Sequence, residues 1–167
     1  LAAFSDTEHP LLRGLLVEVP GTYHHSVQVG ALAEAGARAI GSDRLLARVA
    51  GYFHDIGRLR GMGAPSERRA AAAGLAVEER FPSELAQILA EQPHEDARAA
   101  TTGGRRPRPR SKTSALVFLA DWVEDALRGH EGTVESRAEL EEEVRAQVWA
   151  AVDERLLDEA ALELREL

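Results

Sequence analysis

The stretch "GYFHDIG" (residues 51–57) places a histidine and an aspartate inside an otherwise apolar run. It closes a segment whose apolar residues have helical spacing, so His54 and Asp55 are expected in the last turn of a core helix. Burying an unpaired charge is costly, and these two side chains therefore need either a hydrogen-bonding partner or a metal ion. Which of these they have decides, to a large extent, what the protein does.

The composition around this stretch favours an all-α fold. Ala, Leu, Glu and Arg dominate, Ile is sparse, and aromatic residues make up only 5% of the chain. The length of 167 residues suits one domain with a real core. We therefore predict a single domain over residues 1–167, and the start at Leu1 in mid-pattern indicates a piece excised from a longer protein.

Helical spacing and turn residues predict the order of elements. Thr22, Ser42 and Ser83 are expected to cap helices, and Gly41 to end one. A Gly-rich loop is expected over 57–65, and a final helical turn in the tail from 158. The expected helices span residues 9–20, 22–40, 43–56, 66–80, 83–92, 113–128 and 133–157. The buried stripe of the second helix is expected to contain His25, Val29, Leu32 and Gly36.

Three further properties exclude classes of function. The chain has no cysteine, which excludes disulfides and thiolate metal sites and leaves histidine and carboxylate as metal ligands. A net charge of -8 argues against DNA or RNA as a partner. The sequence has no signal peptide and no apolar stretch of the roughly 20 residues that a transmembrane helix needs.

Three predicted core helices each carry side chains of the metal-ligand type. These are His25 on the second helix, His54 and Asp55 at the end of the third, and Asp121 within the most apolar helix. Taken singly, each has an ordinary explanation as a hydrogen-bonded core residue. Together, two imidazoles and two carboxylates suit a divalent metal ion of intermediate hardness.

This pattern resembles the HD superfamily of metal-dependent phosphohydrolases, whose signature is His…His-Asp…Asp on consecutive helices. The motifs "PGTYHHS" (20–26) and "HDIG" (54–57) resemble more closely the cytosolic HD domain of bacterial seven-transmembrane HD proteins, a group that includes cyclic di-AMP phosphodiesterases. The stretches "ALVFLADWVEDALR" (115–128) and "RLLDEAALELREL" (155–167) are similar to the later helices of that domain. The resemblance implies an all-α HD-domain helical bundle with a metal site between its core helices.

The resemblance also implies a ligand set. In the family, the aspartate of the "HDIG" motif bridges two metal ions, here Mn, Fe, Mg or a similar divalent ion, whose shared water attacks phosphorus. His25 is preferred over His24 because it precedes Ser26 and lies on the more apolar stripe. The implied ligands of the first ion are His25, His54, Asp55 and Asp121.

The sequence departs from the family at the second metal. The family has one histidine on the helix after the "HDIG" loop, where residues 66–82 contain none, and an adjacent His-His pair further on. At the place of the pair, "EQPHED" (91–96) has Pro93 and keeps only His94 as a metal ligand or an exposed remnant. The sequence therefore predicts one intact site and a largely dismantled second one. Oxygen ligands that could substitute are Glu67, Glu91 or Glu95.

Cationic residues near these motifs suit a phosphodiester ligand. Arg58 follows "HDIG", where the family has Lys, and is either a phosphate contact or a solvated surface residue. The basic run over 105–112 includes Arg106 and Arg108, which either bind substrate or belong to a flexible, solvated loop.

The predicted function is that of a divalent-metal-dependent phosphodiesterase acting on a cyclic dinucleotide such as cyclic di-AMP, or another phosphoester, with activity weakened by the second site. Asp55 would help to position the nucleophile and Arg58 would contact the phosphate. The alternative is a catalytically inactive sensor or interaction domain that binds metal or nucleotide. Either would be cytoplasmic, alone or as the cytosolic domain of a membrane-anchored parent protein.

Overall fold

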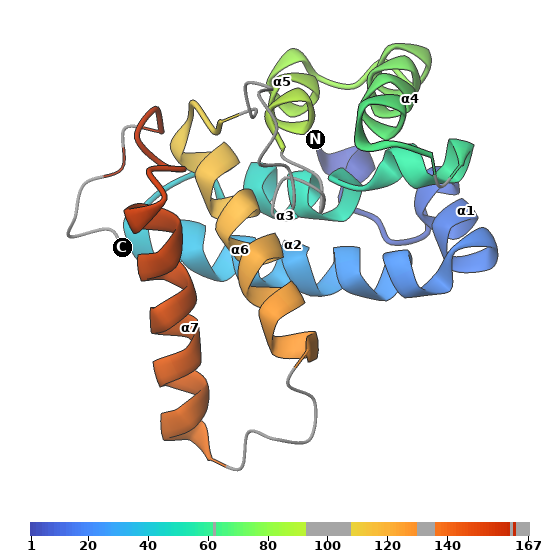
Figure 1. The fold of residues 1–167 in the computed structure, drawn as a ribbon. Helices are drawn as coiled ribbons and strands as arrows, with labels where there is room; N and C mark the ends of the chain where they lie inside the picture. The colour runs from blue at the N-terminus through green and yellow to red at the C-terminus, as the bar shows by residue number, and fades with distance from the viewer. Residues whose placement is uncertain (62, 93–107, 130–135, 161, 163–167) are drawn as a thin grey trace.

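The predicted all-α fold is confirmed by the structure, a computed structural model that describes residues 1–61, 63–92, 108–129, 136–160 and 162. These residues form seven α-helices and two 3₁₀ helices and contain no strand. The elements are η1 (Ala2–Phe4), α1 (Pro10–Glu18), α2 (Pro20–Ile40), α3 (Arg44–Phe53), η2 (Ile56–Arg60), α4 (Pro65–Glu78), α5 (Ser83–Glu91), α6 (Lys112–Gly129) and α7 (Arg137–Asp153) (Figure 1).

The ends of α2 differ in how well the sequence predicted them. Gly41 ends the helix as expected, with a φ of 70° that favours glycine. The start is wrong by two residues, because Pro20 occupies the first helical position, where its missing N–H costs nothing. Thr22 is therefore not a cap but a buried residue within the helix.

Two other predicted caps are shifted by one residue. The N-cap of α3 is Asp43 rather than Ser42, since the Asp43 carboxylate accepts a hydrogen bond of 2.9 Å from the backbone N–H of Leu46. At α5, Ser83 is the first helical residue and Pro82 precedes it as the cap position. Residues 56–60, from the end of the predicted third helix into the predicted Gly-rich loop, instead form the 3₁₀ helix η2.

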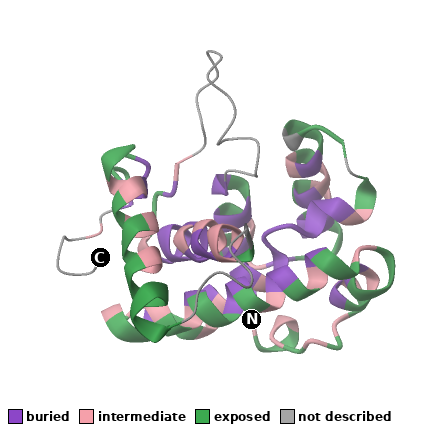
Figure 2. Cartoon of the chain, turned by 60° about the horizontal axis from the view of Figure 1, so that its bottom comes forward, coloured by how far each residue is buried: buried purple, intermediate pink, exposed green. Residues whose placement is uncertain are grey.

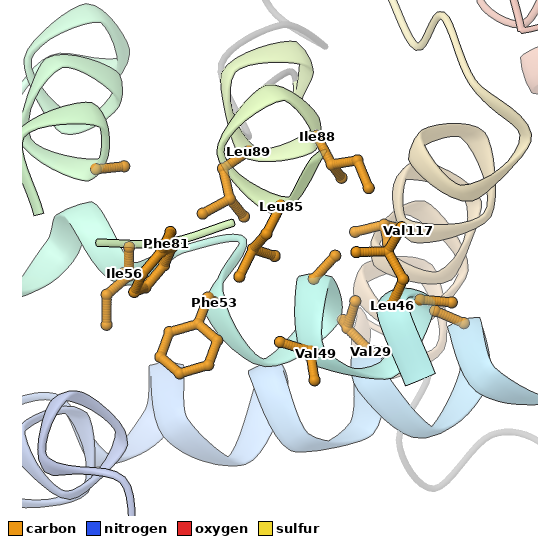
Figure 3. Close-up of a cluster of buried hydrophobic side chains, with 14 of the residues drawn as sticks. Val29, Leu46, Val49, Phe53, Ile56, Phe81, Leu85, Ile88, Leu89 and Val117 are labelled. Atoms are coloured by element: carbon orange, nitrogen blue, oxygen red, sulfur yellow. The ribbon is translucent and has the colours of Figure 1, made fainter. Parts of the chain in front are cut away.

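The main hydrophobic core lies where α2, α3 and α6 meet, with α5 packed on the other side of α3 and α4 packed on η2 and α5 (Figures 1 and 3). The buried face of α2 continues from Val29 through Ala33 and Ala37, whereas the predicted Leu32 is 39% exposed. Small residues on this face allow the neighbouring helices to approach closely. The residues of α3 that face the core are Leu46, Ala47, Val49, Ala50 and Phe53.

A smaller core joins α6, α7 and the turns over 154–160, where the sequence had predicted a longer helix and a final helical turn. α7 lies beside α6 and is largely exposed, with Ala151 as its buried residue (Figure 2). None of the helices in the described part of the chain is both long and apolar enough to cross a membrane.

The backbones of α2 and α3 touch at a pair of glycines. A Cβ atom added to Gly51 would lie only 2.5 Å from the Cα atom of Gly30, a distance that real side chains do not adopt. This close approach determines how near His25 on α2 comes to His54 at the end of α3. The geometry of the candidate site therefore depends on the direct backbone contact between Gly30 of α2 and Gly51 of α3.

Replacing Gly51 tests this dependence. Gly51→Ala is expected to force α3 away from α2 and to lower the free energy of unfolding by about 2–3 kcal/mol, the usual scale for overpacking a core. Gly74→Ala is the matched control, because nothing lies within 4 Å of the added Cβ in the middle of α4. That control should be neutral or stabilising by about 0.5–1 kcal/mol. Urea denaturation of both variants measures the difference, and equal stabilities would contradict the proposed contact.

Candidate metal centre

Three helices bring two histidines and an aspartate into contact. The Nε2 atoms of His25 and His54 lie 3.1 Å apart, and the Oδ1 atom of Asp121 lies 2.9 Å from the first and 3.5 Å from the second. His25 comes from α2, His54 is the C-cap residue of α3, and Asp121 lies in the middle of α6. Both histidines are buried, and the Asp121 side chain is 16% exposed.

The other ring nitrogens of the two histidines are already engaged. The Nδ1–H of His54 donates to the backbone carbonyl of Gly51 at 2.7 Å. The Nδ1 atom of His25 contacts both the Glu124 carboxylate and the Arg128 guanidinium. With Nδ1 protonated, each neutral ring presents a lone pair at Nε2. In that tautomer, two lone pairs and a carboxylate oxygen converge on one point. Such a set of acceptors fits a cation, either a proton or a divalent metal ion.

The pKa shifts of His54 and Asp121 also indicate that the cluster favours a positive charge. Burial alone would lower the pKa of His54, but its hydrogen bond to Asp121 and the charges of Asp55 and Asp121 outweigh burial and raise the pKa to about 9. Burial alone would raise the pKa of Asp121, but hydrogen bonds from His25 and His54 hold it well below its usual range. The carboxylate is therefore ionised, as a metal ligand must be.

Glu124 belongs to this centre, although the sequence analysis missed it. It is buried in α6, one turn after Asp121, and contacts the Nδ1 atom of His25. A carboxylate in this place fixes the tautomer and the orientation of a ligand histidine. The signal that could have revealed it is the i, i+3 spacing from Asp121, which puts both carboxylates on the same face of the helix.

A second group of ligand-type side chains lies on the far side of the His25 ring. Ligand atoms of His25, Glu124 and Asp125 lie within 4.8 Å of one another. The Arg128 guanidinium already pairs with the Glu124 carboxylate and lies 3.5 Å from Asp125. The Arg128 guanidinium thus supplies this group with a cation.

Asp55 lies beside the cluster and is paired with Arg58. Its Oδ2 atom is 4.0 Å from the Nε2 atom of His54 and accepts a hydrogen bond of 2.7 Å from the Nε–H of Arg58. Both side chains are buried. The alternative of a solvated surface arginine at position 58 is therefore wrong. The structure places this predicted phosphate contact against the predicted bridging carboxylate.

The glutamates considered as second-site ligands are engaged elsewhere. Glu67 is exposed and caps α4, accepting a hydrogen bond of 3.1 Å from the backbone N–H of Ala64. Glu91 is buried and accepts hydrogen bonds from Gln87 at 3.1 Å and from the backbone N–H of Arg110 at 3.0 Å. Arg108 is half-buried. The other predicted residues, His94, Glu95 and Arg106, lie outside the described residues.

Two apolar cavities lie away from this centre. One of about 350 Å³ lies between α4 and α5, and its lining includes Arg69, Ala76 and Phe81. The other, of about 270 Å³, lies between α2, α6 and α7, and its lining includes Leu32 and Val148. Neither is lined by a residue of the His–Asp cluster.

The core helices of this domain bring two histidines and an aspartate together in a buried cluster of metal-ligand type. This arrangement is typical of a class of helical His–Asp proteins. The chain belongs to the HD domain family, whose model matches residues 22–126. Members of this family bind divalent metal ions, and the group of His25, His54 and Asp121 could hold one.

Known relatives agree with this assignment. The chain is similar over its whole length to the cyclic-di-AMP phosphodiesterase PgpH of Bacillus subtilis (strain 168), with 31% identity over 206 residues. It spans 29% of the length of that relative. The similarity therefore concerns one part of a longer phosphodiesterase.

Solved structures show the same fold. The chain resembles the crystal structure of the Listeria monocytogenes PgpH HD domain with a TM-score of 0.75 and 26% identity, covering 95% of this chain and 92% of that one. A structure of the same domain in complex with cyclic-di-AMP matches with a TM-score of 0.76 and 25% identity, covering 95% and 90% of the two chains. The match to the HD domain of a phosphodiesterase thus includes nearly the entire chain.

Proposed function

We propose that this chain is a divalent-metal-dependent phosphodiesterase domain that acts on a cyclic dinucleotide such as cyclic di-AMP, and that residues 1–167 form a single HD domain. The observation that carries the proposal is the convergence of the two Nε2 atoms of His25 and His54 on Asp121 in a buried site. The similarity to PgpH, and to its HD domain in complex with cyclic-di-AMP, supports the substrate class.

In this proposal His25, His54 and Asp121 hold the ion, and Asp55 is the fourth ligand. When bound, a divalent ion supplies Lewis-acid activation of water and neutralises charge on the phosphoryl group. The protein contributes the orientation of the ligands, because the contacts at Nδ1 hold both imidazoles with Nε2 toward the site. Asp55 positions the nucleophile, and Arg58 contacts the phosphate of the substrate.

The basic run before α6 supplies the remaining substrate contacts. We assign to Arg106 and Arg108 the attraction of the anionic dinucleotide, since they are cations in a chain with a net charge of -8. The same net charge is unfavourable for the long phosphate backbones of DNA and RNA. The expected partner is therefore a small phosphoester.

The direct test uses the purified chain, stripped of metal and reloaded with Mn²⁺, Fe²⁺ or Mg²⁺. Binding and hydrolysis of cyclic di-AMP, cyclic di-GMP and bis(4-nitrophenyl) phosphate are then measured for each ion. Metal-dependent hydrolysis with a preference for cyclic di-AMP would support the proposal. Absence of metal binding, or hydrolysis that is independent of metal, would contradict it.

A second candidate function is a sensor domain that binds metal or nucleotide without turnover. It is favoured by the residues at the expected second site. On α4, the position of the family histidine is occupied by Glu67 or Arg68. The carboxylates of Glu67 and Glu91 form hydrogen bonds with backbone N–H groups and are not directed to the cluster of His25, His54 and Asp121. Binding of cyclic di-AMP at one metal ion per chain, without hydrolysis, would identify this function.

Glu124 offers a test of the metal site itself. Glu124→Ala is expected to weaken Mn²⁺ binding by about 10–100-fold, the usual cost of losing a carboxylate that orients a ligand histidine. Glu124→Gln keeps an acceptor for the Nδ1–H of His25 and should lose less. Isothermal titration calorimetry measures both, with Glu141→Gln on exposed α7 as the control. Unchanged affinity in Glu124→Ala would show that this contact does not orient His25.

A further inference from the structure

We infer that Arg58 is an internal cation that competes with the metal ion for the Asp55 carboxylate and thereby sets the affinity of the site. The inference rests on the proposed metal site and concerns its regulation. It starts from an asymmetry among the ligand-type residues. Asp121 lies against His25 and His54, whereas Asp55 faces both His54 and the Arg58 guanidinium.

The Asp55–Arg58 pair is local and rigidly placed. The two residues are three apart in a 3₁₀ turn, and the backbone N–H of Arg58 donates to the carbonyl of Asp55 at 3.0 Å. Their side chains meet through the Nε–H of Arg58 at 2.7 Å and are only 7% and 8% exposed. Because the turn itself holds both ends, the guanidinium returns to this carboxylate unless another cation displaces it.

Helix α4 packs directly against the turn. A Cβ atom added to Gly57, between Asp55 and Arg58, would lie 2.0 Å from the carbonyl oxygen of Arg68. Arg68 is itself buried and donates from Nη1 to the carbonyl of Gly63 at 2.7 Å. The backbone of η2 is therefore wedged against α4. Competition for Asp55 must be resolved by side chains, without a movement of the turn.

The competition follows from charge. A guanidinium stays protonated in proteins, so Arg58 keeps its positive charge beside Asp55. The Asp55 Oδ2 atom lies 4.0 Å from the Nε2 atom of His54, so an ion held by the histidines would share this carboxylate with Arg58. Removing Arg58 takes the guanidinium away from a buried carboxylate, and the loss of one partner of a buried ion pair is unfavourable. A metal ion bound at Asp55 would restore a positive charge there. A neutral residue at position 58 should therefore strengthen metal binding.

The test compares neutral variants at position 58 with a matched arginine variant. Arg58→Gln and Arg58→Met both remove the charge, and Met keeps the apolar stem in case the Gln variant does not fold. Arg60→Gln is the control, because Arg60 lies on the same turn but is exposed and pairs with Glu78. Mn²⁺ is titrated calorimetrically into each metal-free protein, with folding checked by circular dichroism.

The expected result is a dissociation constant for Mn²⁺ at least tenfold lower in the neutral Arg58 variants, equal to about 1.4 kcal/mol. Arg60→Gln should bind as the wild type does. In an Asp55→Asn background the gain from Arg58→Gln should vanish, since no carboxylate remains for which the two cations compete.

Two results would overturn the inference, and they are distinguishable. If the folded Arg58 variants bind Mn²⁺ as the wild type does or more weakly, Arg58 is no competitor and the proposed metal site still stands. If neither the wild type nor any variant binds Mn²⁺, the metal site is wrong and the inference fails with it.

Discussion

Asp121→Asn is expected to abolish tight Mn²⁺ binding, with a loss of at least a hundredfold in affinity, and His54→Ala should do the same. Asp121 is the carboxylate within 3.5 Å of both histidine Nε2 atoms, so its charge is central to the site. The ion would join α2, α3 and α6, and saturation at about 100 times its dissociation constant would add about 2.7 kcal/mol to the free energy of unfolding. Both variants should lose this stabilisation, which thermal unfolding with and without Mn²⁺ measures.

Asp125→Asn is the control that makes this result specific. Asp125 lies on the same helix and belongs to the alternative group with His25 and Glu124, which the Arg128 guanidinium occupies. We expect this variant to keep wild-type metal binding. If Asp125→Asn loses the ion while Asp121→Asn retains it, the ion binds at the alternative group. If all three variants bind normally, the cluster is held by hydrogen bonds alone.

Much of the fold was predictable because helical periodicity and backbone conformation are encoded locally. Gly41 is an example, since its left-handed backbone marks the end of α2 in sequence and structure alike. The positions of caps were less predictable, because adjacent residues such as Ser42 and Asp43 compete for the same backbone N–H groups. The buried face of α2 was also partly wrong: alanines at 33 and 37 face the core in place of Leu32 because the neighbouring helices pack closely.

The candidate site was predictable where side-chain type and burial agree. His25 was preferred to His24 from the apolar stripe, and the structure buries His25 and exposes His24. Glu124 was missed because a glutamate in an amphipathic helix usually faces solvent, and its contact with His25 joins residues 99 positions apart. The pairing of Arg58 with Asp55 needed the 3₁₀ turn, which the sequence did not predict.

The structure also indicates which position of α4 corresponds to the missing histidine of the second metal site. Either position 67 or position 68 matches the family histidine by sequence. Glu67 is exposed and caps α4 through the N–H of Ala64, whereas Arg68 is buried with its backbone against Gly57 of the "HDIG" turn. Position 68 is therefore the one that faces the turn.

Rebuilding the second site is expected to have a large effect on catalysis. The wild-type chain should hydrolyse cyclic di-AMP slowly, because a single ion cannot stabilise both the attacking and the leaving oxygen as two ions do. Arg68→His combined with Pro93→His, a residue outside the described part, should raise the Mn²⁺ stoichiometry from about one towards two and increase turnover at least tenfold. Metal analysis and a nucleotide hydrolysis assay measure the two effects.

Glu67→His with Pro93→His is the matched control for this experiment. It introduces the same two histidines and the same loss of proline, but it places one of them at an exposed position, so stoichiometry and turnover should remain at the wild-type values. Circular dichroism must first show that both double variants are folded, since removing Pro93 changes the local backbone. A wild-type chain that already binds two ions and turns over cyclic di-AMP efficiently would show that other residues complete the second site.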